Sequence, residues 1–309
     1  MRALTLALML AALALPARAQ APITVVVNFV AGGPSDLMAR LMAPELSQQL
    51  GVPVVVKNSV GAAGTIGAAE VARARPDGQT LLLSPVGAMA VQPHFRRDLP
   101  YRPTDLVGIC QVADTPVVVM AAPNGPATLR EALARAREAG AGFNYASTGP
   151  GSIPHIATAD IARRAGIGMT HIPFRGNAEA VMALLRGDVT LFADQPGTIR
   201  ANGLRALAVM APARSPEFPD TPTTREEGLD LVYSIWSGLF APAGTPDAFL
   251  ARAEAACQRA MVAPAVVEGF ARLATPITFR GREAFARFWA EELEKFRGIV
   301  ESAGLRPGD

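Results

Sequence analysis

A glycine-rich loop near the start of the chain has the residue types of an anion-binding site. Residues 28–36 read Asn-Phe-Val-Ala-Gly-Gly-Pro-Ser-Asp and follow an apolar, β-branched run at 23–27. Glycine lets backbone N–H groups approach a ligand closely, and the free N–H groups at a helix start favour negative charge. Ser35 or Asp36 is suited to cap the helix that follows. The loop is therefore a candidate carboxylate or phosphate site, but an ordinary strand-to-helix turn fits the same pattern.

A second loop of this kind lies in the other half of the chain. Residues 147–152 read Ser-Thr-Gly-Pro-Gly-Ser, between a short strand expected at 143–146 and a helix expected from 153 to 164. His155, in the first turn of that helix, is suited either to meet a ligand carboxylate or to make a structural hydrogen bond. Two strand-glycine-helix loops, one in each half, predict an anion held from two sides.

Two further polar residues stand where predicted strands end. Ser84 ends the strand expected at 80–84, and Asp194 follows the strand expected at 189–193. Ligands of parallel α/β sheets bind beyond the carboxyl ends of the strands. Asp194 either caps a helix beginning near Gly197 or accepts a hydrogen bond from an amine or hydroxyl of a ligand.

The same residues allow a catalytic alternative. Ser147 or Ser152, with His155 and either Asp160 or Asp194, supplies the residue types of a nucleophile, a base and an orienting acid. The chain has no Gly-x-Ser-x-Gly elbow, which is the usual context of such a serine. A secreted hydrolase of a small ester or amide is the alternative function, and the primary expectation is a protein without catalytic residues.

Nucleotide, metal and cofactor sites are not expected. The only lysines, Lys57 and Lys295, are not followed by Ser or Thr, which excludes a phosphate-binding loop of the Gly-Lys-Ser/Thr type. The glycines at 61, 64 and 67 lack dinucleotide-binding spacing. The three histidines lie far apart in the sequence and the two cysteines stand singly, so no metal ligand set is expected.

The first 19 residues have the layout of a secretory signal peptide. A basic start precedes the apolar run 4–15, and Ala17-Arg18-Ala19 provides a small-x-small cleavage site. We expect the mature chain to begin at Gln20 and to be secreted and soluble. Without Arg2 and Arg18 the 29 basic residues become 27, equal to the 27 acidic ones. A near-neutral chain argues against nucleic acid or a polybasic membrane surface.

Strands and helices alternate along the chain, which predicts an α/β protein with parallel sheets. About 290 residues exceed the usual single core, and the chain crosses twice between halves. We expect a hinged, two-lobed fold with lobe 1 formed by residues 20–122 and 232–309 and lobe 2 by residues 123–231. Trp236 and Phe240 are expected to pack near the hinge. Cys110 and Cys257 either pair or stay as buried free thiols.

The mature chain resembles the substrate-binding proteins of tripartite tricarboxylate transporters, the Bug receptors. The resemblance rests on many modest motifs in one order. They lie at residues 29–36, 61–67, 75–78, 147–152 with His155, 171–176, 204–209, 219–223 and 239–246.

This resemblance implies a type II-like periplasmic binding fold that closes on a small carboxylate, a di- or tricarboxylate or a related acid. It implies a periplasmic monomer that delivers this ligand to a membrane permease. The implied ligand-binding residues come mainly from the two glycine loops, with Ser84 and Asp194 at other positions of the cleft. They are Phe29, Ala31, Gly32, Ser84, Ser147, Thr148, Gly149, Gly151, His155 and Asp194.

Several departures from the family pattern fall near this pocket. The family often has proline at Asn28, a Thr-Ser or Ser-Thr pair at Ser84-Pro85, and Asp-Asn at Ala193-Asp194. These departures concern the identity of the ligand more than the fold.

Overall fold

The computed structural model describes residues 21–303 of the 309-residue chain. The predicted signal peptide lies outside the described residues. Within them, no helix is both long and apolar enough to cross a bilayer.

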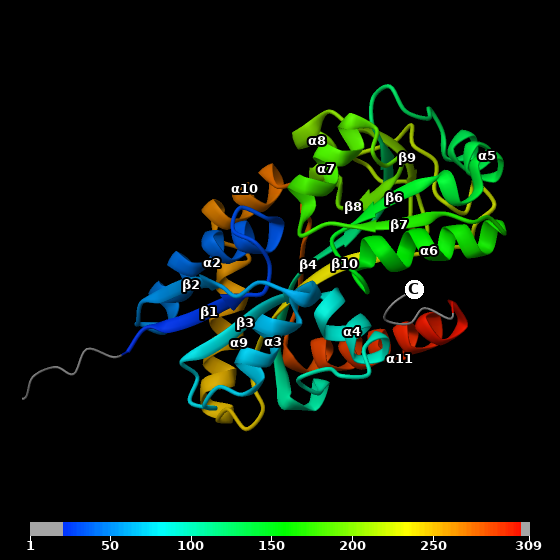
Figure 1. Cartoon of the computed structure of the whole chain (residues 1–309). Coiled ribbons are helices and arrows are strands. Elements are labelled where there is room, and N and C mark those ends of the chain that lie inside the picture. The colour runs from blue at the N-terminus through cyan, green and yellow to red at the C-terminus, as the bar shows by residue number, and fades with distance from the viewer. Residues whose placement is uncertain (1–20, 304–309) are drawn as a thin grey trace, which may run out of the picture.

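A mixed six-stranded sheet, the first sheet, forms the lower half of the view in Figure 1. Its strand order is β11-β4-β10-β3-β1-β2. The strands are β1 (Ile23–Val27), β2 (Val54–Asn58), β3 (Thr80–Pro85), β4 (Leu106–Pro116), β10 (Ser234–Pro242) and β11 (Ile277–Arg280).

Helices cover both faces of the first sheet. Met38 of α2, Leu250 of α9 and Phe270 of α10 share one buried cluster with β1, β3 and β4, and Val71 of α3 and Phe285 of α11 belong to the other. The helical segments are α2 (Pro34–Leu50), η1 (Ala62–Gly64), α3 (Thr65–Ala72), η2 (Gly87–Val91), α4 (Gln92–Phe95), η3 (Pro103–Asp105), α9 (Asp247–Ala260), α10 (Pro264–Arg272) and α11 (Arg282–Ala303).

A second group of strands lies in the upper half of Figure 1. It has a three-stranded sheet in the order β8-β5-β9 and the pair β6-β7, and a bridge between Tyr145 and Leu191 joins the two. The strands are β5 (Val118–Ala121), β6 (Asn144–Ser147), β7 (Thr170–Pro173), β8 (Phe192–Asp194) and β9 (Arg205–Val209). The helical segments are α5 (Leu129–Ala139), η4 (Gly140–Gly142), α6 (Ile153–Ala165), α7 (Asn177–Arg186) and α8 (Pro196–Asn202).

The two halves are joined where β4 leads into β5 and where the chain returns to β10. The backbone N–H of Val117 donates to the Tyr233 carbonyl at 2.9 Å, and the N–H of Met210 donates to the Val117 carbonyl at 2.8 Å. The crossings therefore run side by side.

The expectation of parallel sheets is wrong for the strands next to these crossings. β1 pairs in parallel with β2 and β3, but β10 is antiparallel to β3 and β4, and β5 is antiparallel to β8 and β9. A strand that enters from the other half, without a crossover helix, is not held to the parallel direction.

Cys110 and Cys257 form a disulfide that links β4 to α9. Both residues are fully buried in the apolar cluster on one face of the first sheet. This answers the question of pairing that the sequence left open.

Candidate ligand-binding site

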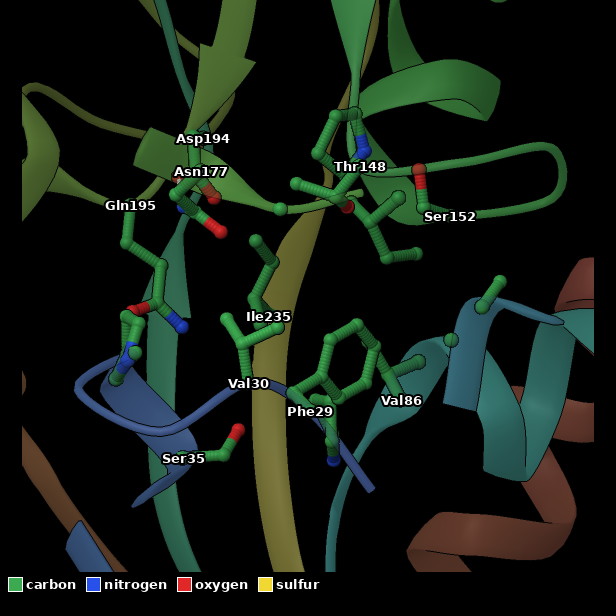
Figure 2. Close-up of a pocket in the computed structure, with 18 residues that line it drawn as sticks. Phe29, Val30, Ser35, Val86, Thr148, Ser152, Asn177, Asp194, Gln195 and Ile235 are labelled. Carbon is green, nitrogen blue, oxygen red and sulfur yellow. Dashed lines mark hydrogen bonds between the residues drawn. The ribbon is translucent and has the colours of Figure 1, made fainter. Parts of the chain in front are cut away.

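A small cavity lies between elements of the two halves (Figure 2). The volume open to the centre of a water molecule is about 70 Å³ in this cavity, and about 590 and 640 Å³ in two adjoining spaces that share lining residues with it. Its apolar wall includes Phe29 and Val30 after β1, Val86 after β3 and Ile235 in the returning strand β10. A space of this size accepts a small molecule rather than a polymer.

Four helices begin at the wall of this cavity. The lining includes Pro34 at the start of α2, Ser152 and Ile153 at the start of α6, Asn177 at the start of α7 and Gln195 just before α8. Helix N-termini carry unpaired N–H groups and partial positive charge. Their convergence favours an anion although none of the described lining residues is Lys, Arg or His.

Three hydroxyl groups lie in the same lining. Ser35 is 7% exposed, and its hydroxyl, like that of Thr148, has no protein partner among the hydrogen bonds of residues 21–303. The hydroxyl of Ser152 accepts only a long 3.5 Å bond from the His155 backbone N–H. These groups are placed to donate to a bound oxygen atom.

The expectation that Ser35 or Asp36 caps α2 is wrong. Gly33 occupies the N-cap position and no side chain caps the helix. Pro34, at the first position of the helix, has no N–H group that a side chain would have to cap. This leaves the Ser35 hydroxyl directed toward the cavity (Figure 2).

Asp194 is the one ionisable residue among the described lining residues, and it is 4% exposed. The Thr198 hydroxyl donates to its Oδ2 at 2.8 Å, and the Asn177 amide donates to the same atom. Burial raises the pKa of Asp194 to about 6, and hydrogen bonds from Thr198 and from the Gln195 backbone N–H oppose the rise. A buried carboxyl near neutrality is typical of functional sites.

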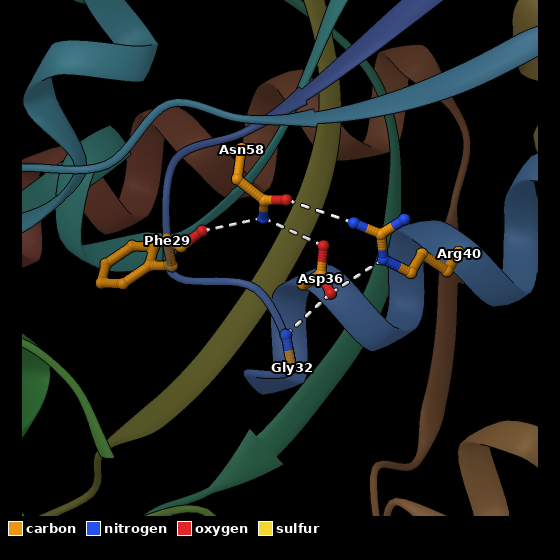
Figure 3. Close-up of polar contacts among 5 residues, drawn as sticks. All are labelled: Phe29, Gly32, Asp36, Arg40 and Asn58. Atoms are coloured by element: carbon orange, nitrogen blue, oxygen red, sulfur yellow. Dashed lines mark hydrogen bonds and ion pairs between the residues drawn. The ribbon is translucent and has the colours of Figure 1, made fainter. Parts of the chain in front are cut away.

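The first glycine loop is held by Asp36 (Figure 3). Its carboxylate accepts bonds from the Gly32 N–H at 2.8 Å, from Arg40 at 2.9 Å and from Asn58 at 2.9 Å, and Asn58 also donates to the Phe29 carbonyl. Burial acts to raise the pKa of Asp36, but these hydrogen bonds outweigh it and lower the pKa below its usual value. The Gly32 N–H is thus bonded within the protein and is not free for a ligand. The hydrogen bonds around Asp36 and Asn58 instead fix the position of Phe29.

The second glycine loop is also satisfied internally. The Gly149 N–H donates to Ser147 Oγ, and the Gly151 N–H donates to His155 Nδ1 at 3.0 Å. The Ser147 hydroxyl contacts His171 Nε2 at 2.5 Å, and the rings of His155 and His171 stack with centroids 3.9 Å apart. Burial lowers the pKa of His155 to about 3, with a further contribution from His171. Both rings are neutral at physiological pH, because burial also lowers the pKa of His171 to about 4.

The predicted site residues thus occupy three different places. Phe29, Thr148 and Asp194 line the central cavity. Ala31 and Gly32 line one of the two spaces that adjoin this cavity, and Gly149 lines the other.

The remaining four predicted residues are buried and line neither the cavity nor the two adjoining spaces. They are Ser84, Ser147, Gly151 and His155. Ser84, for example, accepts a 2.9 Å bond from Asn28 and supports the base of the first loop.

Sequence reasoning did not select Ser35, Ser152, Asn177, Gln195 or Ile235 as ligand-binding residues. Ser152 and Asn177 stand at helix starts and Gln195 follows a strand end, which are signals that can identify such residues. Ile235 gives no comparable signal, because its place depends on the crossing of β10.

The residues proposed for hydrolysis are not assembled. His155 Nδ1 accepts a backbone N–H, and the Asp160 carboxylate binds Arg163 and the Tyr233 hydroxyl. Ser147 does contact a histidine, His171, but it is fully buried, so a substrate has no access to its hydroxyl.

The comparisons with known proteins agree with this geometry. The sequence model of the tripartite tricarboxylate transporter family receptors matches residues 38–305. The chain belongs to this family. It is a family of solute-binding receptors and not of enzymes, so the hydrolase alternative is not supported.

Relatives and solved structures match over nearly the whole chain. BugT of Bordetella pertussis is 36% identical, with 94% of this chain and 91% of BugT covered. MatC of Rhodopseudomonas palustris, solved with bound malate, is 32% identical with a TM-score of 0.85, covering 90% of this chain and 98% of MatC. Rpa4515 of R. palustris, solved with adipate, is 25% identical with a TM-score of 0.87, covering 93% of this chain and 98% of that one. These likenesses confirm the expected α/β periplasmic binding protein fold.

Proposed function

We propose that this receptor captures a small organic carboxylate in the central cavity, between two lobes. The single observation that carries the proposal is the convergence of the α2, α6 and α7 N-termini on a cavity whose Ser35 and Thr148 hydroxyls have no partner within residues 21–303. Such donors replace water around a carboxylate without a basic side chain. The bound malate and adipate of the two related structures support this ligand class.

We place the lobe boundary at the crossing strands. β5 (Val118–Ala121) pairs with β8 and β9 of the second group, so the first lobe ends near residue 117 rather than 122. The second lobe then runs to about residue 233. Two adjacent crossings are a suitable hinge for closure around a ligand.

The receptor is proposed to act as a monomer in the periplasm and to hand its ligand to the permease of a tripartite tricarboxylate transporter. Family membership supports the partner. The buried disulfide between Cys110 and Cys257 supports the compartment, because disulfides persist in oxidising environments.

A thermal-shift screen of carboxylates against their uncharged amides tests the ligand class. A ligand that binds only the folded state adds about 2.7 kcal/mol at a hundred times its Kd. Stabilisation by one class of acid and not by its amides is expected. No stabilisation by any acid, with a shift for uncharged compounds instead, would overturn the proposal.

A further inference from the structure

The central cavity contains one charged side chain and it is an acid. Asp194 is 4% exposed, and the described lining residues include no base to neutralise it. The groups that face its carboxylate are the Thr198 hydroxyl, the Asn177 amide and the Gln195 backbone N–H, all of them neutral. Among the residues that the structure describes, an ionised Asp194 therefore has no cation paired with it.

Apart from Ser35, which lies at the start of α2, the polar side chains of the cavity fall into two sets in Figure 2. Thr148 and Ser152 lie on one side, and Asp194, Asn177 and Gln195 lie on the other. The first set offers hydroxyl donors at the start of α6. The second set lies at the starts of α7 and α8, and its donors are already bonded to a carboxylate of the protein, that of Asp194.

A ligand with a carboxylate at each end fits this division poorly. Its second carboxylate would lie on the side of Asp194, where the described lining of the cavity supplies no cation between them, and like charges at short range repel. An ammonium group would instead complete the hydrogen bonding of Asp194 and neutralise its charge.

We infer that Asp194 is a specificity-determining residue that selects a small amino acid, with its ammonium group on Asp194 and its carboxylate on the Thr148 and Ser152 side. This inference rests on the proposed function, because it concerns the ligand of the same cavity. A hydroxy acid is the next best ligand, since its hydroxyl can donate to Asp194, and an unsubstituted acid is the poorest.

Calorimetric titration with matched series tests the inference. The probes are alanine, lactate and propanoate, and then aspartate, malate and succinate, which differ within each series only in the amine, hydroxyl or hydrogen on one carbon. At pH 8 the amino acid of at least one series is expected to bind roughly 10- to 100-fold more tightly than the unsubstituted acid, the range for a hydrogen bond to a charged group. Asp194→Asn should remove most of this ratio. Asp188→Asn makes the same chemical change in an exposed ion pair with Arg186, outside the cavity and its adjoining spaces, and should leave the ratio unchanged.

A second measurement uses the pH dependence of binding. In the wild-type protein, the ratio of amino acid to unsubstituted acid affinity should fall as pH drops from 8 to 5, because protonation of Asp194 removes the partner of the ammonium group. In the Asp194→Asn variant this ratio should not change with pH. That comparison separates the titration of Asp194 from the titration of the ligands themselves.

The possible failures are distinguishable. Equal or tighter binding of the unsubstituted acids at pH 8, unaffected by Asp194→Asn, would overturn the inference and leave the carboxylate receptor intact. Absence of binding by every acid in the carboxylate screen and in both series would overturn the proposed function as well.

Discussion

The Thr198 hydroxyl donates a 2.8 Å hydrogen bond to Oδ2 of Asp194, and this bond ties the start of α8 to the end of β8. The Asn177 amide reaches the same oxygen from the start of α7. A single buried carboxylate thus joins three elements at the cavity wall. The Thr198 and Asn177 donors stabilise the ionised form of Asp194, whereas burial favours the protonated form.

Removal of the Thr198 hydroxyl should raise the pKa of Asp194 further, because the hydrogen bond stabilises the ionised carboxylate. Thr198→Val is expected to lose about 1.5–3 kcal/mol of unfolding free energy at pH 8 and less at pH 5. Urea denaturation at the two pH values measures the difference. Thr198→Ser, which keeps the hydroxyl, is the control; equal losses at both pH values for Thr198→Val would contradict this role.

Asp194 should also make the stability of the whole protein depend on pH. Its pKa is raised from 3.8 to about 6 in the folded state, so between these values the folded protein holds more protons than the unfolded one. The contribution of Asp194 to stability therefore falls as pH rises from about 4 to about 6. The amount is about 3 kcal/mol by pH 7.

Asp194→Asn removes this titration. The difference in unfolding free energy between the variant and the wild type should therefore shift in favour of the variant as pH rises from 4 to 7. Urea denaturation across this range measures it. A difference that stays constant with pH would show that folding does not raise the pKa of Asp194.

Two serines of α2 offer a matched test of the site. The Ser35 hydroxyl faces the cavity with no partner in the described part of the chain, whereas that of Ser47 donates to the Val52 carbonyl at 2.9 Å. Ser35→Ala should weaken carboxylate binding roughly 10- to 100-fold with little change in stability. Ser47→Ala should cost about 1 kcal/mol of stability with unchanged affinity. Calorimetric titration and urea denaturation of both variants provide the readouts, and unimpaired binding by Ser35→Ala would remove Ser35 from the site.

The disulfide should contribute stability and not affinity. Cys110 and Cys257 are 147 residues apart in sequence, and closing a loop of that length in the unfolded chain is worth about 3–5 kcal/mol. The double variant Cys110→Ala/Cys257→Ala should have a lower Tm and the same ligand Kd. Reductant should lower the Tm of the wild type alone. Detection of two free thiols in the unfolded, unreduced protein would contradict the pairing.

Much of the helical structure could be predicted from the sequence. The apolar periodicity of residues 282–303 predicts a long amphipathic helix, and α11 (Arg282–Ala303) has these limits. Thr128 is a predicted helix cap, and α5 begins directly after it, with the Thr128 hydroxyl accepting the Glu131 N–H. Strand β4 was missed, because Gly108, Gln111 and Asp114 interrupt its apolar pattern. It is nevertheless central to the first sheet, where packing by both neighbours compensates for weak local preference.

The site was only partly predictable. Both glycine loops were located, and Thr148 and Asp194 reach the cavity. Ser147, next to Thr148, does not, because neighbouring side chains at a strand end point to opposite sides. Sequence alone does not fix which one faces the ligand. Ile235 and Gln195 line the same cavity only because the chain crosses between the two halves, and such a crossing depends on long-range contacts.

The central claim is that the cavity binds an organic acid through donors that recognise its carboxylate. The most direct measurement is a calorimetric titration of the wild-type protein and the Thr148→Val variant with the best acid from the screen and with its primary amide. The account predicts saturable, one-to-one binding of the acid, at least tenfold weaker binding of the amide, and a selective loss of acid affinity in Thr148→Val. Equal affinity for acid and amide, unaffected by Thr148→Val, would contradict it.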